Sequence, residues 1–316
     1  MNMIRRRGWE IPESQVTPEA AVIGRRKLLG TSLALSIGGT ALGRAAMAQE
    51  AAVGGAGPRN DKYVAGREIT AEASATTYNN YYEFSEGKNL WRSAQQLKLR
   101  PWTVVIDGMV AKPQTLDVDS LISQVKLEER IYRHRCVERW AMTVPWTGFP
   151  MTELLRIADP QPSAKYIVFE SLADKKMMPG VRSPYYPWPY IEGVAIDEAA
   201  NDVAFMSTGM FGKPLTPQNG GPVRITLPWK YGFKSAKALV RITFTDKRPV
   251  SLWEQINPSE YGFWANVNPA VAHPRWSQAD ETLIGDERTV KTVIYNGYGD
   301  FVAGLYDSRK SEKLFV

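Results

Sequence analysis

The chain has 316 residues, of which 44% are hydrophobic and 23% charged, a composition typical of a soluble globular protein with one large or two modest domains. Seven basic and three acidic residues within the first 48 contribute +4 to the formal net charge of +6, so the remainder carries +2. A body so close to neutral gives no electrostatic reason to expect binding to nucleic acid.

Residues 1–48 read as a twin-arginine signal peptide. Arg25 and Arg26 precede an apolar stretch, residues 28–42, which glycines interrupt and which is too short to span a membrane comfortably. The stretch leads to Ala-Met-Ala at residues 46–48, a small-x-small cleavage site. Because this route exports proteins that are already folded, we predict a periplasmic protein that receives a cofactor in the cytoplasm. The alternative is a basic tail that is never removed.

The rest of the chain divides into a small, polar segment at residues 49–77, expected to be a loosely ordered arm, and a catalytic domain at residues 78–316. No later segment approaches 18 uninterrupted apolar residues, so a soluble mature protein is expected. The only cysteine, Cys136, has no partner for an internal disulfide. Cys136 is therefore either a small buried apolar residue or one kept for its chemistry.

Hydrophobic patterns and turn residues predict an α+β domain with mixed sheets, more strand than helix, and long ordered loops. In chain order the expected elements are a strand at 102–110 with a turn at Asp107-Gly108, a short helix at 121–122 capped by Asp119-Ser120, a strand at 126–136, a helix at 150–158 that opens with proline, and strands at 164–170, 222–227 and 238–245. The longest aromatic connection, residues 183–190, reads Ser-Pro-Tyr-Tyr-Pro-Trp-Pro-Tyr. Long ordered loops of this kind are usually functional.

Cys136 lies among potentially positive side chains in the run Tyr-Arg-His-Arg-Cys-Val-Glu-Arg-Trp, residues 132–140. Neighbouring cations stabilise a thiolate, which is the form that binds metals and attacks electrophiles. Zinc is disfavoured, because His134 and His273 are the only histidines and no ligand spacing typical of zinc follows. A buried structural thiol remains the alternative.

Two further segments suggest a cofactor. Residues 218–224, Gln-Asn-Gly-Gly-Pro-Val-Arg, combine a glycine turn that can approach an anion with an arginine that can bind phosphate. Lys230, Lys234, Ser235 and Lys237 follow and would suit a phosphate cradle, although an ordinary turn and a solvated basic loop would look the same. Residues 78–84, Tyr-Asn-Asn-Tyr-Tyr-Glu-Phe, offer rings for stacking on a heterocycle and polar groups for its edges; packing on the core is the alternative.

Taken together, these segments resemble the sulfite-oxidase superfamily of molybdopterin enzymes, and most closely the catalytic subunits of bacterial periplasmic protein-methionine-sulfoxide reductases. The resemblance rests on five segments in the right order behind a twin-arginine signal, residues 78–84, 135–146, 185–193, 218–237 and 261–278. It implies the molybdopterin-binding fold of that superfamily over nearly the whole mature chain.

The resemblance also implies site residues. Cys136 corresponds to the cysteine that ligates molybdenum and is the expected catalytic residue. The residues that correspond to pterin contacts are Asn79, Tyr82, Glu83, Ser171, Asn219, Arg224, Ser235, Ala236 and Lys237. Ser171 stands where the family usually has threonine, and Arg139 departs from the family's small residue, which changes the charge near the metal.

The implied activity is oxygen-atom transfer from methionine sulfoxide in periplasmic proteins to reduced molybdenum, which carries one pterin without an added nucleotide. The implied partners are the oxidised proteins and a haem-containing membrane subunit that passes electrons from the quinone pool. Residues 185–190 are the candidate wall of the substrate pocket, unless they are ordinary packing. The rivals are a sulfite dehydrogenase on the same scaffold, a metal-free thiol enzyme using Cys136 and His273, and a periplasmic binding protein without catalysis.

Overall fold

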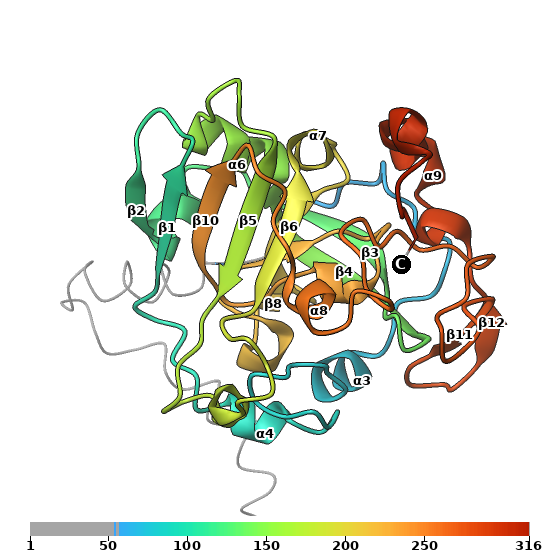
Figure 1. Ribbon diagram of the computed structural model, residues 1–316. Helices are drawn as coiled ribbons and strands as arrows, with labels where there is room; N and C mark the ends of the chain where they lie inside the picture. Colours follow the sequence, from blue (N-terminus) through green and yellow to red (C-terminus); the bar gives the residue numbers. More distant parts are fainter. Residues whose placement is uncertain (1–53, 55–56, 316) are drawn as a thin grey trace, which may run out of the picture. The chain divides into compact units, whose positions relative to one another are not determined.

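A computed structural model describes residue 54 and residues 57–315, and the signal peptide expected at residues 1–48 lies outside them. Short helices and longer strands alternate along the described chain (Figure 1). The strands are β1 (Thr103–Gly108), β2 (Gln114–Asp117), β3 (Glu128–Arg135), β4 (Trp140–Pro150), β5 (Tyr166–Ser171), β6 (Ile191–Ala195), β7 (Phe205–Met210), β8 (Lys213–Pro214), β9 (Arg224–Thr226), β10 (Leu239–Thr245), β11 (Asp280–Leu283) and β12 (Thr289–Lys291). The α-helices are α3 (Glu72–Thr77), α4 (Trp91–Ala94), α5 (Val118–Ser123), α6 (Met151–Ala158), α7 (Ile196–Ala199), α8 (Leu252–Ile256) and α9 (Gly299–Val302). The 3-10 helices are η3 (Pro179–Arg182), η4 (Pro217–Asn219), η5 (Gly232–Lys234), η6 (Ile294–Gly297) and η7 (Ala303–Arg309).

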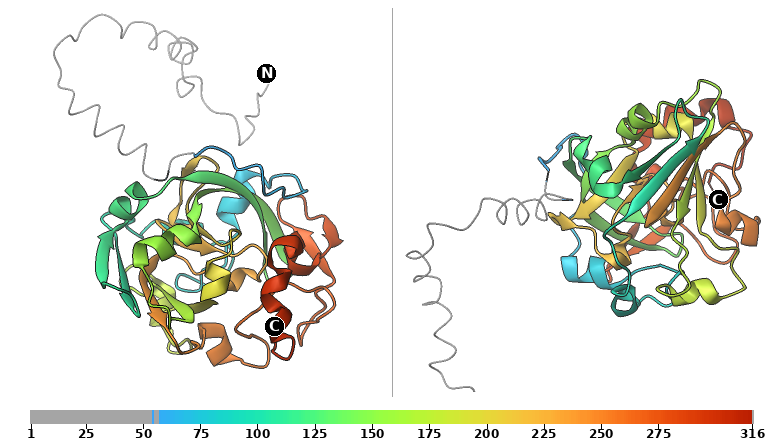
Figure 2. Two further views of the ribbon diagram at one scale, coloured as in Figure 1. Left: turned by 90° about the horizontal axis from the view of Figure 1, so that it is seen from above. Right: turned by 90° about the vertical axis from the view of Figure 1, so that its left-hand side faces the viewer.

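The strands form two mixed sheets. One has five strands in the order β2-β1-β10-β5-β6, with β1 parallel to β10 and the other pairs antiparallel. The other has seven strands along the path β12-β11-β4-β7-β8, with β3 pairing with β4 and β9 with β7. The long green strands β3 and β4 curve across the folded unit in Figure 2. The expected α+β class, richer in strand than in helix, is confirmed.

Strand β4 is the longest of several strands that sequence patterns missed, with β2, β6, β7, β8, β11 and β12. Ten of its eleven residues are buried, so the alternation of apolar and polar residues that marks a half-exposed strand is absent. Pro145 lies inside it, opposite Ile131 of β3, and a proline in a run normally argues against a central strand. The register of β4 against β7 also shifts between Thr147 and Gly148.

Two expectations about local structure need correction. The N-cap of α5 is Asp117, whose carboxylate accepts hydrogen bonds from the backbone N–H groups of Asp119 (2.9 Å) and Ser120 (3.4 Å), so the helix begins earlier than expected. The arm expected to be loosely ordered is packed over its described part, residues 57–77. Tyr63 is buried there against Tyr132 of β3, and α3 forms next to η4.

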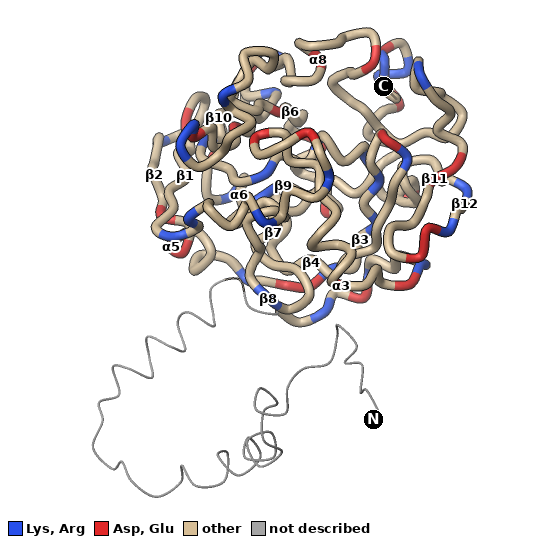
Figure 3. Tube along the Cα trace, turned by 90° about the horizontal axis from the view of Figure 1, so that it is seen from below, with Lys and Arg blue, Asp and Glu red and all other residues tan. Residues whose placement is uncertain are grey.

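Basic and acidic residues are interspersed over the described part of the chain (Figure 3). Among the described residues, none of the helices is long and apolar enough to cross a bilayer.

Candidate active site

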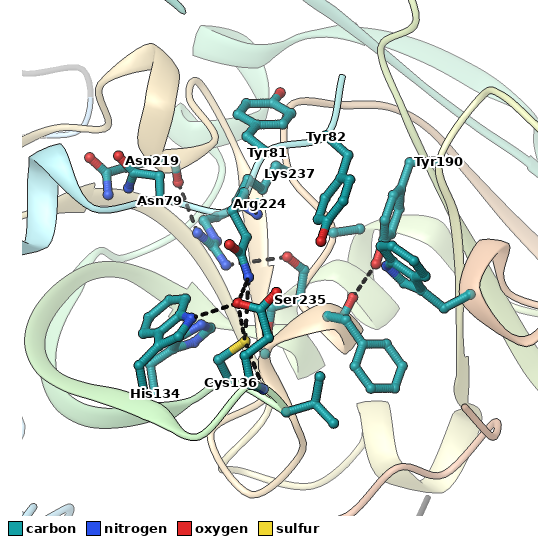
Figure 4. A pocket seen from close by; sticks show the side chains of 18 of the residues that line it. Asn79, Tyr81, Tyr82, His134, Cys136, Tyr190, Asn219, Arg224, Ser235 and Lys237 are labelled. Atoms are coloured by element: carbon teal, nitrogen blue, oxygen red, sulfur yellow. Dashed lines mark hydrogen bonds between the residues drawn. The ribbon is translucent and has the colours of Figure 1, made fainter. Parts of the chain in front are cut away.

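One cavity collects most of the residues predicted from the sequence. It holds about 820 Å³ of empty space, part of it open to solvent. Four segments meet there: the turn after β3, the segment before α4, the turn around η4 and the segment after η5 (Figure 4). Its lining includes nine of the ten predicted site residues: Asn79, Tyr82, Glu83, Cys136, Asn219, Arg224, Ser235, Ala236 and Lys237. Segments up to 158 positions apart in the chain therefore converge on one site.

The tenth residue, Ser171, is not among the residues that line this cavity. It ends β5 and is buried, and its backbone N–H donates to the carbonyl of Tyr190 at 3.0 Å. Tyr190 does line the cavity, so Ser171 lies directly behind the wall. The Ser171 hydroxyl has no hydrogen-bond partner among the described residues, and its contact with a pterin stays a prediction.

Cys136 is positioned by the tight turn between β3 and β4. Its backbone N–H donates to the carbonyl of Trp140 at 2.9 Å, and its carbonyl accepts from the N–H of Arg139 at 3.0 Å. Arg139 adopts a φ of 75°, in the left-handed region that disfavours residues with a side chain. The Sγ atom faces the cavity, 3.4 Å from the side-chain nitrogen of Asn80 and 3.4 Å from the backbone nitrogen of Glu138.

The cations around Cys136 lower the pKa of its thiol, but burial outweighs them. Arg135 turns away to Glu281 (Nε to Oε2, 2.8 Å) and the Gln278 side chain (2.7 Å). Burial, followed by the negative charge of Glu138, raises the pKa of the Cys136 thiol to about 12. Coordination to a metal ion favours the thiolate form of such a sulfur.

Glu138 lies beside the cysteine and gathers three donors. Its Oε2 accepts hydrogen bonds from Lys88 Nζ (2.5 Å), Asn80 Nδ2 (3.1 Å) and Trp140 Nε1 (3.1 Å). Burial tends to raise the pKa of Glu138, but the bonds from Lys88 and Asn80 outweigh it and the pKa is lowered. Glu138 is therefore held as a carboxylate beside Cys136, with its charge balanced by the ion pair with Lys88.

The buried guanidinium of Arg224 lies against the turn around η4. Gly220 has a φ of 93°, and a Cβ there would lie 2.7 Å from Lys237 Cγ, so glycine lets the turn close on that lysine. Arg224 is buried and donates to the carbonyls of Asn219 (2.9 Å) and Ser235 (3.2 Å). Neither Arg224 nor Lys237 forms an ion pair with any carboxylate of the described chain. Two cations held this way form a site for an anion.

The three lysines expected in one phosphate cradle have different roles. Lys230 is buried and pairs with Glu198 of α7 at 2.5 Å, and Lys234 pairs with the buried Glu192 of β6. Both anchor the segment to elements outside the cavity, because a fully buried ammonium group needs a carboxylate partner. Only Lys237 lines the cavity, where its Nζ donates to the carbonyl of Asn80 at 2.9 Å.

Unpaired polar groups in the wall mark where a ligand would bind. The side-chain oxygens of Asn79 and Asn80 and the hydroxyl of Tyr81 are buried without a hydrogen-bond partner among the described residues. Burial raises the pKa of Glu83 to about 7, against the lowering effect of Lys237, so its carboxyl can donate or accept near neutral pH. This wall can match donors and acceptors on the edge of a heterocycle.

Aromatic rings form another part of the cavity wall. Tyr82 packs edge-on against Trp253 (4.9 Å between ring centroids), and Trp253 lies 5.2 Å from Tyr261; all three line the cavity. Of the aromatic loop at residues 185–190, only Tyr190 reaches the cavity; Tyr186 packs behind Tyr82 at 5.7 Å. In Figure 4, Tyr82 and Tyr190 lie on one side of Cys136, and Asn79, Asn219 and Arg224 on the other.

Sequence reasoning missed several lining residues. His134, considered only as a zinc ligand, lines the cavity; a Cβ on Gly232 would lie 2.5 Å from its Nε2, so the glycine permits this close approach. Asn80 follows the predicted Asn79 directly, and this position in the same short segment could have indicated that Asn80 also lines the cavity. Trp253 and Tyr261 lie far along the chain from Cys136, and no motif points to Trp253.

His273 is not placed to activate Cys136. Its ring stacks on Trp276 at 3.9 Å, its Nδ1 accepts from the N–H of Arg275, and its Nε2 lies 3.4 Å from Glu260 Oε2. It is absent from the residues that share the cavity with the cysteine. The described residues also contain no cluster of three or more His, Cys, Asp or Glu side chains that could hold a metal ion. A metal at Cys136 would thus take its other ligands from a bound cofactor.

Sequence comparisons show the family to which the chain belongs. The family described as the oxidoreductase molybdopterin-binding domain matches residues 92–253, which assigns the chain to the molybdopterin-binding oxidoreductases. A protein-methionine-sulfoxide reductase catalytic subunit MsrP from Ralstonia nicotianae is 47% identical over 98% of this chain and 97% of its own length. One from Burkholderia mallei is 44% identical over 98% of this chain and 96% of its own length. The chain therefore belongs to the family of protein-methionine-sulfoxide reductase catalytic subunits.

A solved structure, the sulfane dehydrogenase SoxCD from Paracoccus pantotrophus, aligns with a TM-score of 0.48 at 14% identity, covering 87% of this chain and 66% of that chain.

The cavity fits a molybdopterin. Arg224 and Lys237 are available for its phosphate, and the unpaired oxygens of Asn79 and Asn80 suit the N–H groups of a pterin edge. Cys136 supplies a soft sulfur ligand at the far side of the same cavity.

Proposed function

We propose that this chain reduces methionine sulfoxide in exported proteins with a mononuclear molybdenum held by one pterin, without an added nucleotide, and by Cys136. When bound, this cofactor supplies a two-electron centre that can exchange an oxygen atom. The chain's residues do the rest: Arg224, Lys237 and the Asn79 segment hold the pterin, and Cys136 fixes the metal end.

The observation that carries the proposal is the chemistry around Cys136. Aromatic rings of Tyr82, Trp253 and Tyr261 line the cavity, and the carboxylate of Glu138 lies beside the sulfur. The neutral side chain of methionine sulfoxide suits such a wall. Among the described residues, Arg224 and Lys237 are the lysine and arginine side chains that line the cavity, and the cofactor's phosphate would occupy them, so the dianion sulfite would be left without a side-chain counter-charge.

We expect holoenzyme to reduce peptide methionine sulfoxide, with a reduced viologen dye as electron donor, with a kcat/KM at least about 100-fold above that for sulfite oxidation with an oxidised dye as electron acceptor. Burying a dianion without a partner costs several kcal/mol, and each 1.4 kcal/mol is tenfold. Steady-state kinetics with both substrates measures this. Protein from cells grown on tungstate is the control, and it should be inactive. Preference for sulfite supports a sulfite dehydrogenase, and full activity of the tungstate protein supports a thiol enzyme.

We also propose that residues 1–48 direct the folded holoprotein to the periplasm. Replacing Arg25 and Arg26 together by lysine should leave the protein in the cytoplasm with its cofactor, because the transport receptor reads the arginine pair as an address. Cell fractionation and immunoblotting measure the distribution, and lysine replacement of Arg5 and Arg6 is the matched control. Normal export of the Arg25/Arg26 variant would refute the twin-arginine assignment.

The relatives' names describe a catalytic subunit, which implies a partner subunit. We propose that this partner is a haem-containing membrane protein that passes electrons from the quinone pool, and that oxidised periplasmic proteins are the substrates.

A further inference from the structure

A half-buried tryptophan connects the molecular surface to the residue next to the cysteine. Trp276 Nε1 donates a hydrogen bond of 2.9 Å to the carbonyl of Val137, whose peptide bond joins it directly to Cys136. The neighbours of Trp276 in the chain, Arg275 and Ser277, are exposed. One hydrogen bond and a short run of covalent bonds therefore lead from the indole ring to Sγ.

The surroundings hold this ring in place. His273 stacks on Trp276 with an interplanar angle of 9°, and the Arg275 guanidinium lies 4.7 Å from the ring centroid on the solvent side. The same Val137 carbonyl accepts a second hydrogen bond of 2.9 Å from Gln278, which in turn binds Arg135. His273 also packs against Tyr261, which lines the cavity. Trp276 itself does not line the cavity, so this aromatic connection runs from the surface to the chain behind Cys136.

The reaction requires that electrons enter the chain. Reducing a sulfoxide to a thioether breaks the S–O bond and forms two O–H bonds of water, which consumes two electrons and two protons. A protein donor of single electrons must deliver them in two steps to a centre that lies inside the chain. Trp and Arg at the surface are also the residue types that dominate contacts between proteins.

We propose that Trp276 is the residue through which electrons enter this chain and reach the metal centre, by way of its hydrogen bond to Val137 and the backbone of Cys136. This inference rests on the proposed function, because it assumes a redox centre bound to Cys136. It concerns the supply of electrons and not the sulfoxide itself, so it can be tested without substrate.

The test injects single electrons at a defined surface position. Holoenzyme carrying Ser277→Cys is labelled there with a photoactive ruthenium bipyridyl complex, and the rate of electron arrival at the metal centre is followed by absorbance after a flash. Adding Trp276→Phe, which keeps an aromatic ring but loses the N–H donor, should slow arrival about tenfold, equivalent to a barrier higher by about 1.4 kcal/mol.

The matched control is Trp91→Phe in the same labelled protein, because Trp91 is also half-buried beneath an arginine, with Arg92 at 4.5 Å, but does not line the cavity. It should leave the rate unchanged. Molybdenum content and viologen-driven turnover should be unchanged in Trp276→Phe, since the small dye reaches the cavity directly. The proposal is overturned if the rate of electron arrival after the flash is unaltered in Trp276→Phe. It is also overturned if dye-driven turnover falls together with that rate. Failure of the proposed function would appear instead as unlabelled holoenzyme that does not reduce sulfoxide with the dye.

Discussion

Replacing Cys136 by serine is expected to abolish sulfoxide reduction and to strip most of the molybdenum from the purified protein. The Sγ atom faces the cavity, and no other cysteine exists to replace it. Serine offers a harder oxygen ligand with a much higher pKa, which suits this metal less well. The loss should exceed about 100-fold, the upper end for residues that only orient a metal ligand. Metal analysis and viologen-driven turnover measure the two effects.

The control for this variant is Met178→Leu, which alters a fully buried sulfur residue outside the cavity at nearly constant volume. It should retain both metal and turnover, so a loss confined to Cys136→Ser points to ligation and not to general damage. Normal molybdenum content together with normal turnover in Cys136→Ser would show that the sulfur is not a ligand.

Replacing Lys237 by methionine is expected to weaken retention of the cofactor about 10- to 100-fold, since a hydrogen bond to a charged group contributes about 1.5–3 kcal/mol. Lys237 lines the cavity without an ion-pair partner in the described chain. Burial, together with the charge of Arg224, lowers the pKa of Lys237 to about 7. The ammonium group therefore lacks sufficient negative charge nearby when no phosphate is bound. The cofactor-free variant should therefore be no less stable than the parent protein.

Lys234→Met, three residues earlier, should behave in the opposite way. It leaves the buried carboxylate of Glu192 without its cation, which typically costs about 3–5 kcal/mol of folding free energy. Thermal unfolding of the cofactor-free proteins, combined with dialysis of the loaded ones, separates the two variants. If Lys237→Met retains cofactor as firmly as the parent, the phosphate assignment of Lys237 is wrong.

The local elements that carry their own signals could be predicted. The helix at 150–158 appears as α6, and the strands expected at 126–136 and 238–245 appear as β3 and β10, because their apolar periodicity and bounding residues are local properties. Cys136 and the segments at 78–84 and 218–224 were recognised as motifs, and the fold brings them to one cavity.

The sequence alone therefore determined which groups are present: one cysteine, one glycine turn with an arginine, and one segment with two asparagines, each identifiable from its neighbours in the chain. Tertiary structure decided their environments. How far the arginines near Cys136 can lower its pKa depends on where they turn, and Arg135 turns to Glu281, 146 positions away. Whether a lysine serves a ligand or the fold depends on whether a carboxylate from a distant strand or helix meets it, as Glu192 and Glu198 meet Lys234 and Lys230. Burial and charge pairing are set by contacts between distant segments, and these are properties that local sequence patterns do not contain.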